Sequence, residues 1–240
     1  MGVVIPQVIT EDRASGAQVI DGSLKFDGTQ SLSRTAATAG NRKTFTVSAW
    51  VKTTSPDGIQ NLFSAYQTGG ASEFSLSFRD GGSSNPELVY DQGAAAPSGG
   101  VAFTNAVYRD FSAWLHVVYV GDYSNATATE RIRLFVNGER INSFRTITNG
   151  IDSDGSWNWA GAHHIGRSPS DSNRFKGYMA ELHSVDGQAL APTDFGFTDP
   201  LTNTWRPKKY TGTYGTNGFY HPDYPVEDRN HSSHMCQYTF

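Results

Sequence analysis

The stretch Phe45-Thr46-Val47-Ser48-Ala49-Trp50-Val51 decides the fold class, because apolar side chains occupy every second position along it. Alternation of this kind places the side chains of the odd-numbered residues, from Phe45 to Val51, on one buried face of a β-strand. Residues 73–78 and 131–136 repeat the pattern. Residues 114–120 form a nearly continuous apolar run of strand length, which predicts a central strand buried on both faces.

The turn residues support an antiparallel arrangement. Asp-Gly and Asn-Gly pairs recur along the chain, and they tolerate the positive φ of tight hairpin turns. The pair Asn137-Gly138, between two apolar runs, predicts a two-residue hairpin. No stretch has a convincing helical period, and residues 188–195 form at most one short turn. The sequence therefore predicts an all-β, two-sheet antiparallel sandwich.

Composition excludes several classes of protein. The chain has 240 residues, a formal charge of -4 and one cysteine, Cys236. This charge gives no electrostatic case for binding nucleic acid, and no apolar run is long enough to insert into a membrane. One cysteine cannot form an intrachain disulfide, and no conventional signal peptide is visible, so we expect folding in a reducing cytoplasm.

Both ends of the chain differ from its centre. Residues 1–19 have few core-forming side chains and are predicted to form an N-terminal arm. Residues 20–195 carry the strand pattern. Residues 196–240 are rich in tyrosine, threonine and glycine but have few aliphatic residues, which predicts an extension without a core of its own.

Several stretches, in order, resemble laminin-G-like jelly rolls of the concanavalin A-like lectin/glucanase superfamily. The first is Ser23-Leu24-Lys25-Phe26-Asp27-Gly28, followed by Ser31-Leu32. The others are residues 45–51, 114–118, 134–138, 164–166 and 175–182. The resemblance implies a two-sheet jelly roll over residues 20–195.

A narrower resemblance extends beyond the jelly roll. Residues 34–50, 109–114, 186–196 and 205–220 are similar to proteins of marine tailed phages. Such proteins are virion components that belong to the capsid decoration, tail or fibre. The resemblance implies a structural protein that is made in the host cytoplasm and binds capsid or tail subunits in the virion. The alternative is a carbohydrate-binding module that adsorbs the particle to host surface glycans.

Enzymatic activity is not expected. Glucanases of the superfamily carry two glutamates four residues apart on one strand, which places both carboxylates on one sheet face. Here each glutamate is alone on its predicted strand: Glu73, Glu130, Glu139 and Glu181.

Metal sites have only weak candidates, and no cofactor is expected to be required. Laminin-G-like relatives often bind calcium through carboxylate and carbonyl oxygens, so the loop residues Asp152, Asp154, Asp171 and Asp186 are the calcium candidates. The alternative, which we favour, is that these aspartates only form turns. The C-terminal His231, His234 and Cys236 resemble a soft-metal cluster, against the favoured alternative of a solvated tail.

Two tryptophans in a polar loop suggest a contact surface. Trp157 and Trp159 are surrounded by glycine, serine and aspartate, and exposed aromatic rings often mark binding sites. They could stack on a saccharide, pack over the edge of the sandwich, or contact another virion subunit. Tyr123, after the central strand, is a weaker candidate of the same kind.

The C-terminal extension carries the candidate assembly contacts, because tyrosine and tryptophan are enriched where protein surfaces meet. These residues are Trp205, Tyr210, Tyr214, Phe219, Tyr220 and Tyr224. Two arrangements are open: the extension and the N-terminal arm lie on neighbouring subunits, or they fold back onto their own sandwich.

Overall fold

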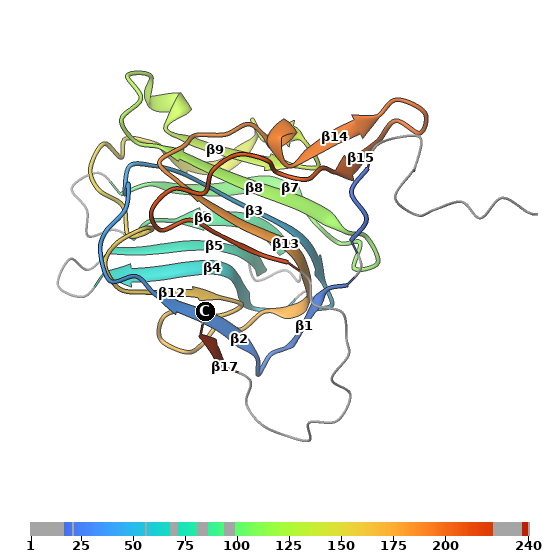
Figure 1. The fold of residues 1–240 in the computed structure, drawn as a ribbon, viewed down its shortest axis with the longest axis horizontal. Helices are drawn as coiled ribbons and strands as arrows, with labels where there is room; N and C mark the ends of the chain where they lie inside the picture. The colour runs from blue at the N-terminus through green and yellow to red at the C-terminus, as the bar shows by residue number, and fades with distance from the viewer. Residues whose placement is uncertain are drawn as a thin grey trace, which may run out of the picture.

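Two large β-sheets face each other across the core (Figure 1). The structure is a computed structural model, which describes residues 17–20, 22–55, 57–67, 72–80, 86–93, 99–222 and 237–239. Its strand pairs are antiparallel except for a parallel pairing of the last strand, β17, with β2. The predicted all-β, two-sheet antiparallel sandwich is therefore confirmed.

Sheet A has the strand order β1-β13-β3-β8-β9-β10, and β16 also pairs with β13. Its strands are β1 (Leu24–Asp27), β3 (Thr44–Thr53), β8 (Leu115–Asp122), β9 (Ile132–Val136), β10 (Glu139–Arg140), β13 (Lys176–Asp186) and β16 (Phe219–His221).

Sheet B has the order β11-β7-β6-β5-β4-β12-β2-β17. Its strands are β2 (Ser31–Thr35), β4 (Ile59–Gln67), β5 (Ser72–Asp80), β6 (Pro86–Asp91), β7 (Val101–Val107), β11 (Phe144–Thr148), β12 (Ala162–Ile165) and β17 (Gln237–Thr239). A separate hairpin consists of β14 (Gly196–Asp199) and β15 (Thr204–Pro207). Two short 3-10 helices are η1 (Ala128–Glu130) and η2 (Pro192–Asp194), and no helix among the described residues could cross a membrane.

The core forms on the face that the sequence alternation predicts. In β3, the side chains of Phe45, Val47, Ala49 and Val51 are fully buried between the sheets. Strand β8 is buried on both faces along most of its length, as its continuous apolar run predicts. At the predicted hairpin, Asn137 and Gly138 have φ values of 50° and 82°, the positive values that a two-residue turn requires.

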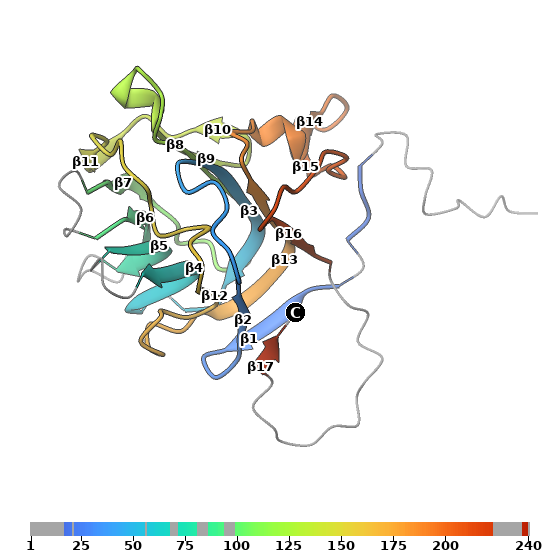
Figure 2. The ribbon, with the colours of Figure 1, turned by 60° about the vertical axis from the view of Figure 1, so that its left-hand side comes forward.

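The C-terminal segment folds back onto its own sandwich. We call residues 196–221 the C-terminal cover, and its β14–β15 hairpin lies on the side of sheet A that faces away from sheet B (Figure 2). Strand β16 pairs with Leu182, His183 and Ser184 of β13 and so extends sheet A. Of the two arrangements open from the sequence, folding back therefore holds for the described part of the extension. Residues 1–16, most of the predicted N-terminal arm, lie outside the described residues.

Asp186, at the end of β13, connects three separate segments. Its buried carboxylate accepts hydrogen bonds from the backbone N–H of Asn41 at 2.7 Å, the side-chain amide of Asn158 at 3.1 Å and the backbone N–H of Asn217 at 2.9 Å. Asn41 precedes β3, Asn158 lies in the loop before β12, and Asn217 belongs to the C-terminal cover. One carboxylate thus holds the cover against the sandwich.

Replacing the Asp186 carboxylate with an amide should destabilise the fold. In Asp186→Asn an NH2 group replaces one carboxylate oxygen and meets N–H donors of Asn41, Asn158 or Asn217 with which it cannot form a hydrogen bond. We therefore expect the free energy of unfolding to fall by about 2–3 kcal/mol. Urea denaturation measures this. Asp57→Asn is the control, because the exposed Asp57 carboxylate makes no hydrogen bond or ion pair with the described part of the chain, and its change should stay within about 0.5 kcal/mol. Equal effects of the two variants would contradict the assigned role.

Candidate functional site

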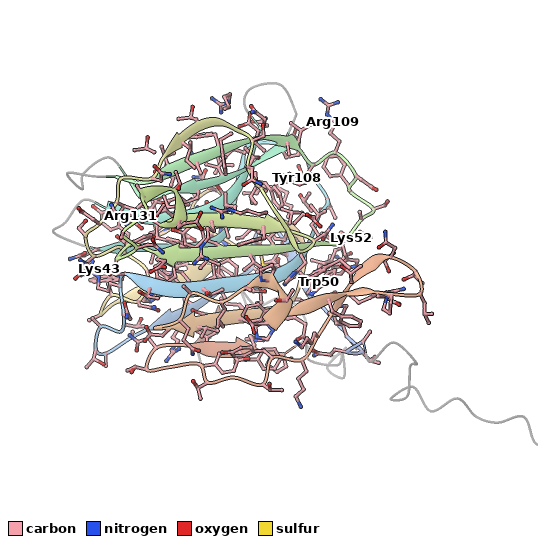
Figure 3. The ribbon with its side chains drawn as sticks, turned by 90° about the horizontal axis from the view of Figure 1, so that it is seen from above. Lys43, Trp50, Lys52, Tyr108, Arg109 and Arg131 are labelled. Carbon is pink, nitrogen blue, oxygen red and sulfur yellow. The ribbon has the colours of Figure 1, made fainter. Side chains whose placement is uncertain are left out.

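Three tryptophans line a groove where β3 and β8 of sheet A meet the β14–β15 hairpin. The groove has a volume of about 460 Å³, within the roughly 300–1,000 Å³ of small-ligand pockets. Figure 3 shows Trp50 beside the hairpin. The lining residues are Trp50, Trp114, Asn137, Glu139, Thr198, Asn203, Thr204 and Trp205.

A stacked column of rings forms one side of this groove. The imidazole of His116 stacks on Trp50 at 5.1 Å between ring centroids, and on Trp205 at 5.9 Å. The indole N–H of Trp205 donates to Nδ1 of His116 at 3.0 Å. Because an indole nitrogen can only donate, Nδ1 must be unprotonated, and the proton on Nε2 is donated to Oγ of Ser48 at 2.8 Å. These bonds fix His116 as the neutral Nε2–H tautomer.

Two glycines make room for the Trp205 ring. A Cβ atom built at Gly138 would lie 2.4 Å from the ring, and one at Gly196 would lie 2.5 Å from it. Gly138 belongs to the β9–β10 turn and Gly196 begins β14. The indole is therefore held between the turn and its own hairpin, which sets the position of one wall of the groove.

The polar groups of the groove are largely free to bind a ligand. Within the described residues, the side chains of Glu139 and Asn203 accept and donate no hydrogen bond, and both residues are exposed. Asn137 uses its carbonyl oxygen to accept from the backbone N–H of His116 at 2.8 Å, which leaves its NH2 group unpaired in the same part of the chain. Trp114 is 37% exposed at the start of β8. The groove thus combines apolar ring faces with unpaired amide and carboxylate groups.

Two of the three glycan candidates from the sequence, Trp157 and the weaker candidate Tyr123, are buried, which corrects the expectation of an exposed contact surface at these residues. Trp157 packs between the sheets against Phe63 and Phe74, and its indole N–H donates to Oγ of Ser184 at 3.1 Å. The hydroxyl of Tyr123 lies 2.9 Å from that of Tyr90 and 2.7 Å from that of Tyr119, all three rings being fully buried. Burial raises the pKa of each of these tyrosines.

Trp159 also has a packing role. It is partly buried against the core, and its indole N–H donates to the carbonyl oxygen of Ala162 at 3.4 Å. Packing over the sandwich edge, one of the alternatives open from the sequence, therefore describes Trp159.

The four calcium candidates do not converge. The carboxylate of Asp171 contacts the guanidinium groups of Arg167 and Arg174, Asp154 lies 3.8 Å from Arg42, and Asp186 accepts the three hydrogen bonds described above. Asp152 lies exposed in the loop that follows β11. Among the described residues, no three His, Cys, Asp or Glu side chains are grouped to hold a metal ion. The structure therefore does not bring the four candidates together, and Asp154, Asp171 and Asp186 each contact protein groups of their own.

The aromatic residues of the cover contact the sandwich of their own chain. Tyr214 and Tyr220 stack on the buried His183, with centroid distances of 6.1 and 4.7 Å, and Tyr210 contacts the same ring edge-on. The ring of Phe219 lies 5.6 Å from the guanidinium of Arg34. Trp205 lines the groove. The remaining candidates lie outside the described residues: Tyr224, His231, His234 and Cys236.

Sequence reasoning missed most of the groove. Trp50, Trp114, Asn137, Glu139 and Asn203 come from four separate elements or turns, and no local motif connects them. One signal was available. Trp50 is at an even-numbered position of β3, on the face that points away from the core, and a large aromatic ring on that face needs another part of the chain to pack against.

The protonation state of His116 gives the fold a specific pH dependence. Burial, with a smaller contribution from the charge of His183, lowers the pKa of His116 to about 3. In the unfolded chain His116 has an ordinary histidine pKa of 6.5. At pH values below 6.5 the unfolded chain therefore binds more protons at this residue than the folded chain does. Stability is present in full above pH 6.5 and is lost as the pH falls toward 3.

We expect His116→Gln to weaken this pH dependence. Glutamine can accept from Trp205 and donate to Ser48 without titrating. Between pH 7 and 4 the wild type should lose about 3 kcal/mol more than the variant, from about 1.4 kcal/mol per pH unit. Urea denaturation at both pH values provides the slopes, and His163 and His164, each with a pKa lowered to about 4, remain in both proteins. Parallel slopes would contradict the neutral, bonded state of His116.

Comparison with known proteins identifies the fold family. Residues 26–194 match a family model described as the concanavalin A-like lectin/glucanases superfamily. Among curated proteins, none matches the chain. The native heptameric SAP-like pentraxin from Limulus polyphemus has 17% sequence identity and a TM-score of 0.51, with a match over 71% of this chain and 78% of that chain.

Domains LG4-5 of the mouse laminin alpha1 chain are similar to the same degree. They have 14% sequence identity and a TM-score of 0.51, with a match over 92% of this chain and 51% of that chain. At these identities the likeness to solved structures shows the fold alone. The family model itself spans well over half of the sequence, and the chain therefore belongs to the concanavalin A-like lectin/glucanase superfamily.

Proposed function

We propose that this protein is a carbohydrate-binding jelly roll of a phage virion, and that it holds saccharides in the groove between Trp50, Trp114 and Trp205. The observation that carries the binding part is this grouping of three tryptophans with polar side chains, of which Glu139 and Asn203 have no hydrogen-bond partner in the described chain. A pyranose ring has an apolar face of C–H groups and a rim of hydroxyls. Indole rings match the face, and amide and carboxylate groups match the rim.

The fold supports this use of the groove. His116 and the two glycines hold Trp205 in place before any ligand arrives, so the ring pays little conformational entropy on binding. Trp50 lies on a sheet strand and Trp114 at the start of another, which gives all three rings rigid support. The proposed role is binding without hydrolysis.

Removing the exposed tryptophan should abolish most of the affinity. We expect Trp114→Ala to weaken binding of the best saccharide on a glycan array by about tenfold, the change in Kd that about 1.4 kcal/mol produces. Because Trp114 is 37% exposed, the fold should tolerate the change. Isothermal titration calorimetry measures the affinity, and mass spectrometry of the recovered saccharide should show it uncleaved.

Tyr66→Ala is the matched control for this experiment. Tyr66 is 40% exposed and lies on β4 of the opposite sheet, so its removal deletes a similar aromatic surface outside the groove. We expect it to leave affinity unchanged. Failure of every saccharide on the array to bind, or equal losses in the two variants, would refute binding in the groove.

The virion part of the proposal rests on the similarity of residues 34–50, 109–114, 186–196 and 205–220 to proteins of marine tailed phages. Three of these stretches contribute to the groove: residues 34–50 include Trp50, residues 109–114 include Trp114, and residues 205–220 include Trp205. A capsid decoration, tail or fibre protein with this groove would present its saccharide site on the outside of the particle. The partners would then be capsid or tail subunits on one side and host surface glycans on the other.

Immunoelectron microscopy tests the virion assignment. An antibody raised against the recombinant protein should label purified particles of the phage that encodes it. Hundreds of copies per particle indicate a capsid decoration, and a handful indicate a tail or fibre component. Labelling restricted to lysed host material would contradict a virion role without affecting the saccharide site.

A further inference from the structure

We propose that the groove selects neutral over acidic saccharides, and that the carboxylate of Glu139 determines this choice by accepting hydrogen bonds from sugar hydroxyls. This inference rests on the proposed saccharide-binding function. It follows from the charge of the groove, because Glu139 is the one charged side chain among its eight lining residues.

No cation in the described chain pairs with the Glu139 carboxylate. Its neighbour Arg140 is already engaged: the guanidinium lies 2.9 Å from Glu130 and donates to the carbonyl oxygen of Thr129 at 3.1 Å. Arg133, on the adjacent strand β9, lies 3.9 Å from Asp122. The negative charge of Glu139 therefore remains uncompensated at the groove.

Lys52 is another cation to consider, because Figure 3 shows it near Trp50. It is not among the lining residues, and another carboxylate is close to it. The pKa of Asp110 is lowered mainly by hydrogen bonds from Ser112 and also by the charge of Lys52. The ammonium of Lys52 thus acts on the carboxylate of Asp110.

A free carboxylate has two consequences for a saccharide. Its two oxygens accept hydrogen bonds from hydroxyl groups, and bonds to a charged acceptor are stronger than those between neutral groups. It also repels a uronic acid, sulfate or sialic acid group placed in the same groove, and this repulsion increases where protein excludes water. Asn137 and Asn203 add amide groups that are equally suited to neutral hydroxyls.

Matched pairs of hexasaccharides provide the test. Cellohexaose differs from β-1,4-hexaglucuronate, and β-1,4-mannohexaose from β-1,4-hexamannuronate, by oxidation of C6 to a carboxylate. We expect the wild type to bind the neutral member of a pair at least about tenfold more tightly at low ionic strength, the selectivity that one uncompensated charge supports. Calorimetric titration of the whole chain measures all four affinities.

The variant Glu139→Gln assigns the selectivity to one residue. The neutral hexasaccharide should bind it about three- to tenfold more weakly, as expected for a lost charge-assisted hydrogen bond, while the acidic partner should bind more tightly than it binds the wild type. Glu87→Gln is the control, because Glu87 lies on β6 of the opposite sheet and pairs with Arg145 at 3.0 Å. Its selectivity should equal that of the wild type.

The outcomes separate this inference from the proposed function. Tighter binding of an acidic member, or equal selectivity of the wild type and Glu139→Gln, overturns the role of Glu139 while saccharide binding stands. Binding of none of the four hexasaccharides, together with no binding on the glycan array, overturns both.

Discussion

The indole nitrogen of Trp205 donates to Nδ1 of His116 at 3.0 Å, and this bond joins the C-terminal cover to the centre of sheet A. It requires a neutral imidazole, which the buried position of His116 provides by lowering its pKa. It also places Trp205 over Gly138, where any larger residue would collide with the ring. This one bond therefore contributes both to the wall of the groove and to the packing on the outer face of β3 and β8.

The strands were predictable from the sequence because their signal is local. The alternation from Phe45 to Val51 specifies which face is buried, and Asn137-Gly138 specifies a turn, without reference to the rest of the chain. The groove was not predictable in this way. Trp50, Trp114 and Trp205 are far apart in sequence, and they meet only after the cover has folded back onto sheet A.

Trp157 was predicted to be exposed but is buried, and the cause is related. Its neighbours are polar and small, a composition that favours an exposed loop. In the structure the loop enters the core, because its polar groups find partners there: Ser156 bonds with the amide of Gln92, and the Trp157 indole bonds with Ser184. The local composition shows which polar groups a loop contains. Whether the loop can be buried depends on whether residues distant in sequence form hydrogen bonds with those groups.

Ligand binding in the groove would also affect the stability of the docked cover. A ligand that contacts both Trp114, from the sandwich, and Trp205, from the cover, binds only the state in which the cover is docked. Binding must then stabilise the docked state by the difference between the ligand's binding free energies for the docked and undocked states. Asp186 and His183 hold the other parts of the cover on sheet A, so the cover is already docked when no ligand is bound. In this way Trp205, which packs against the sandwich, also forms part of the proposed binding surface.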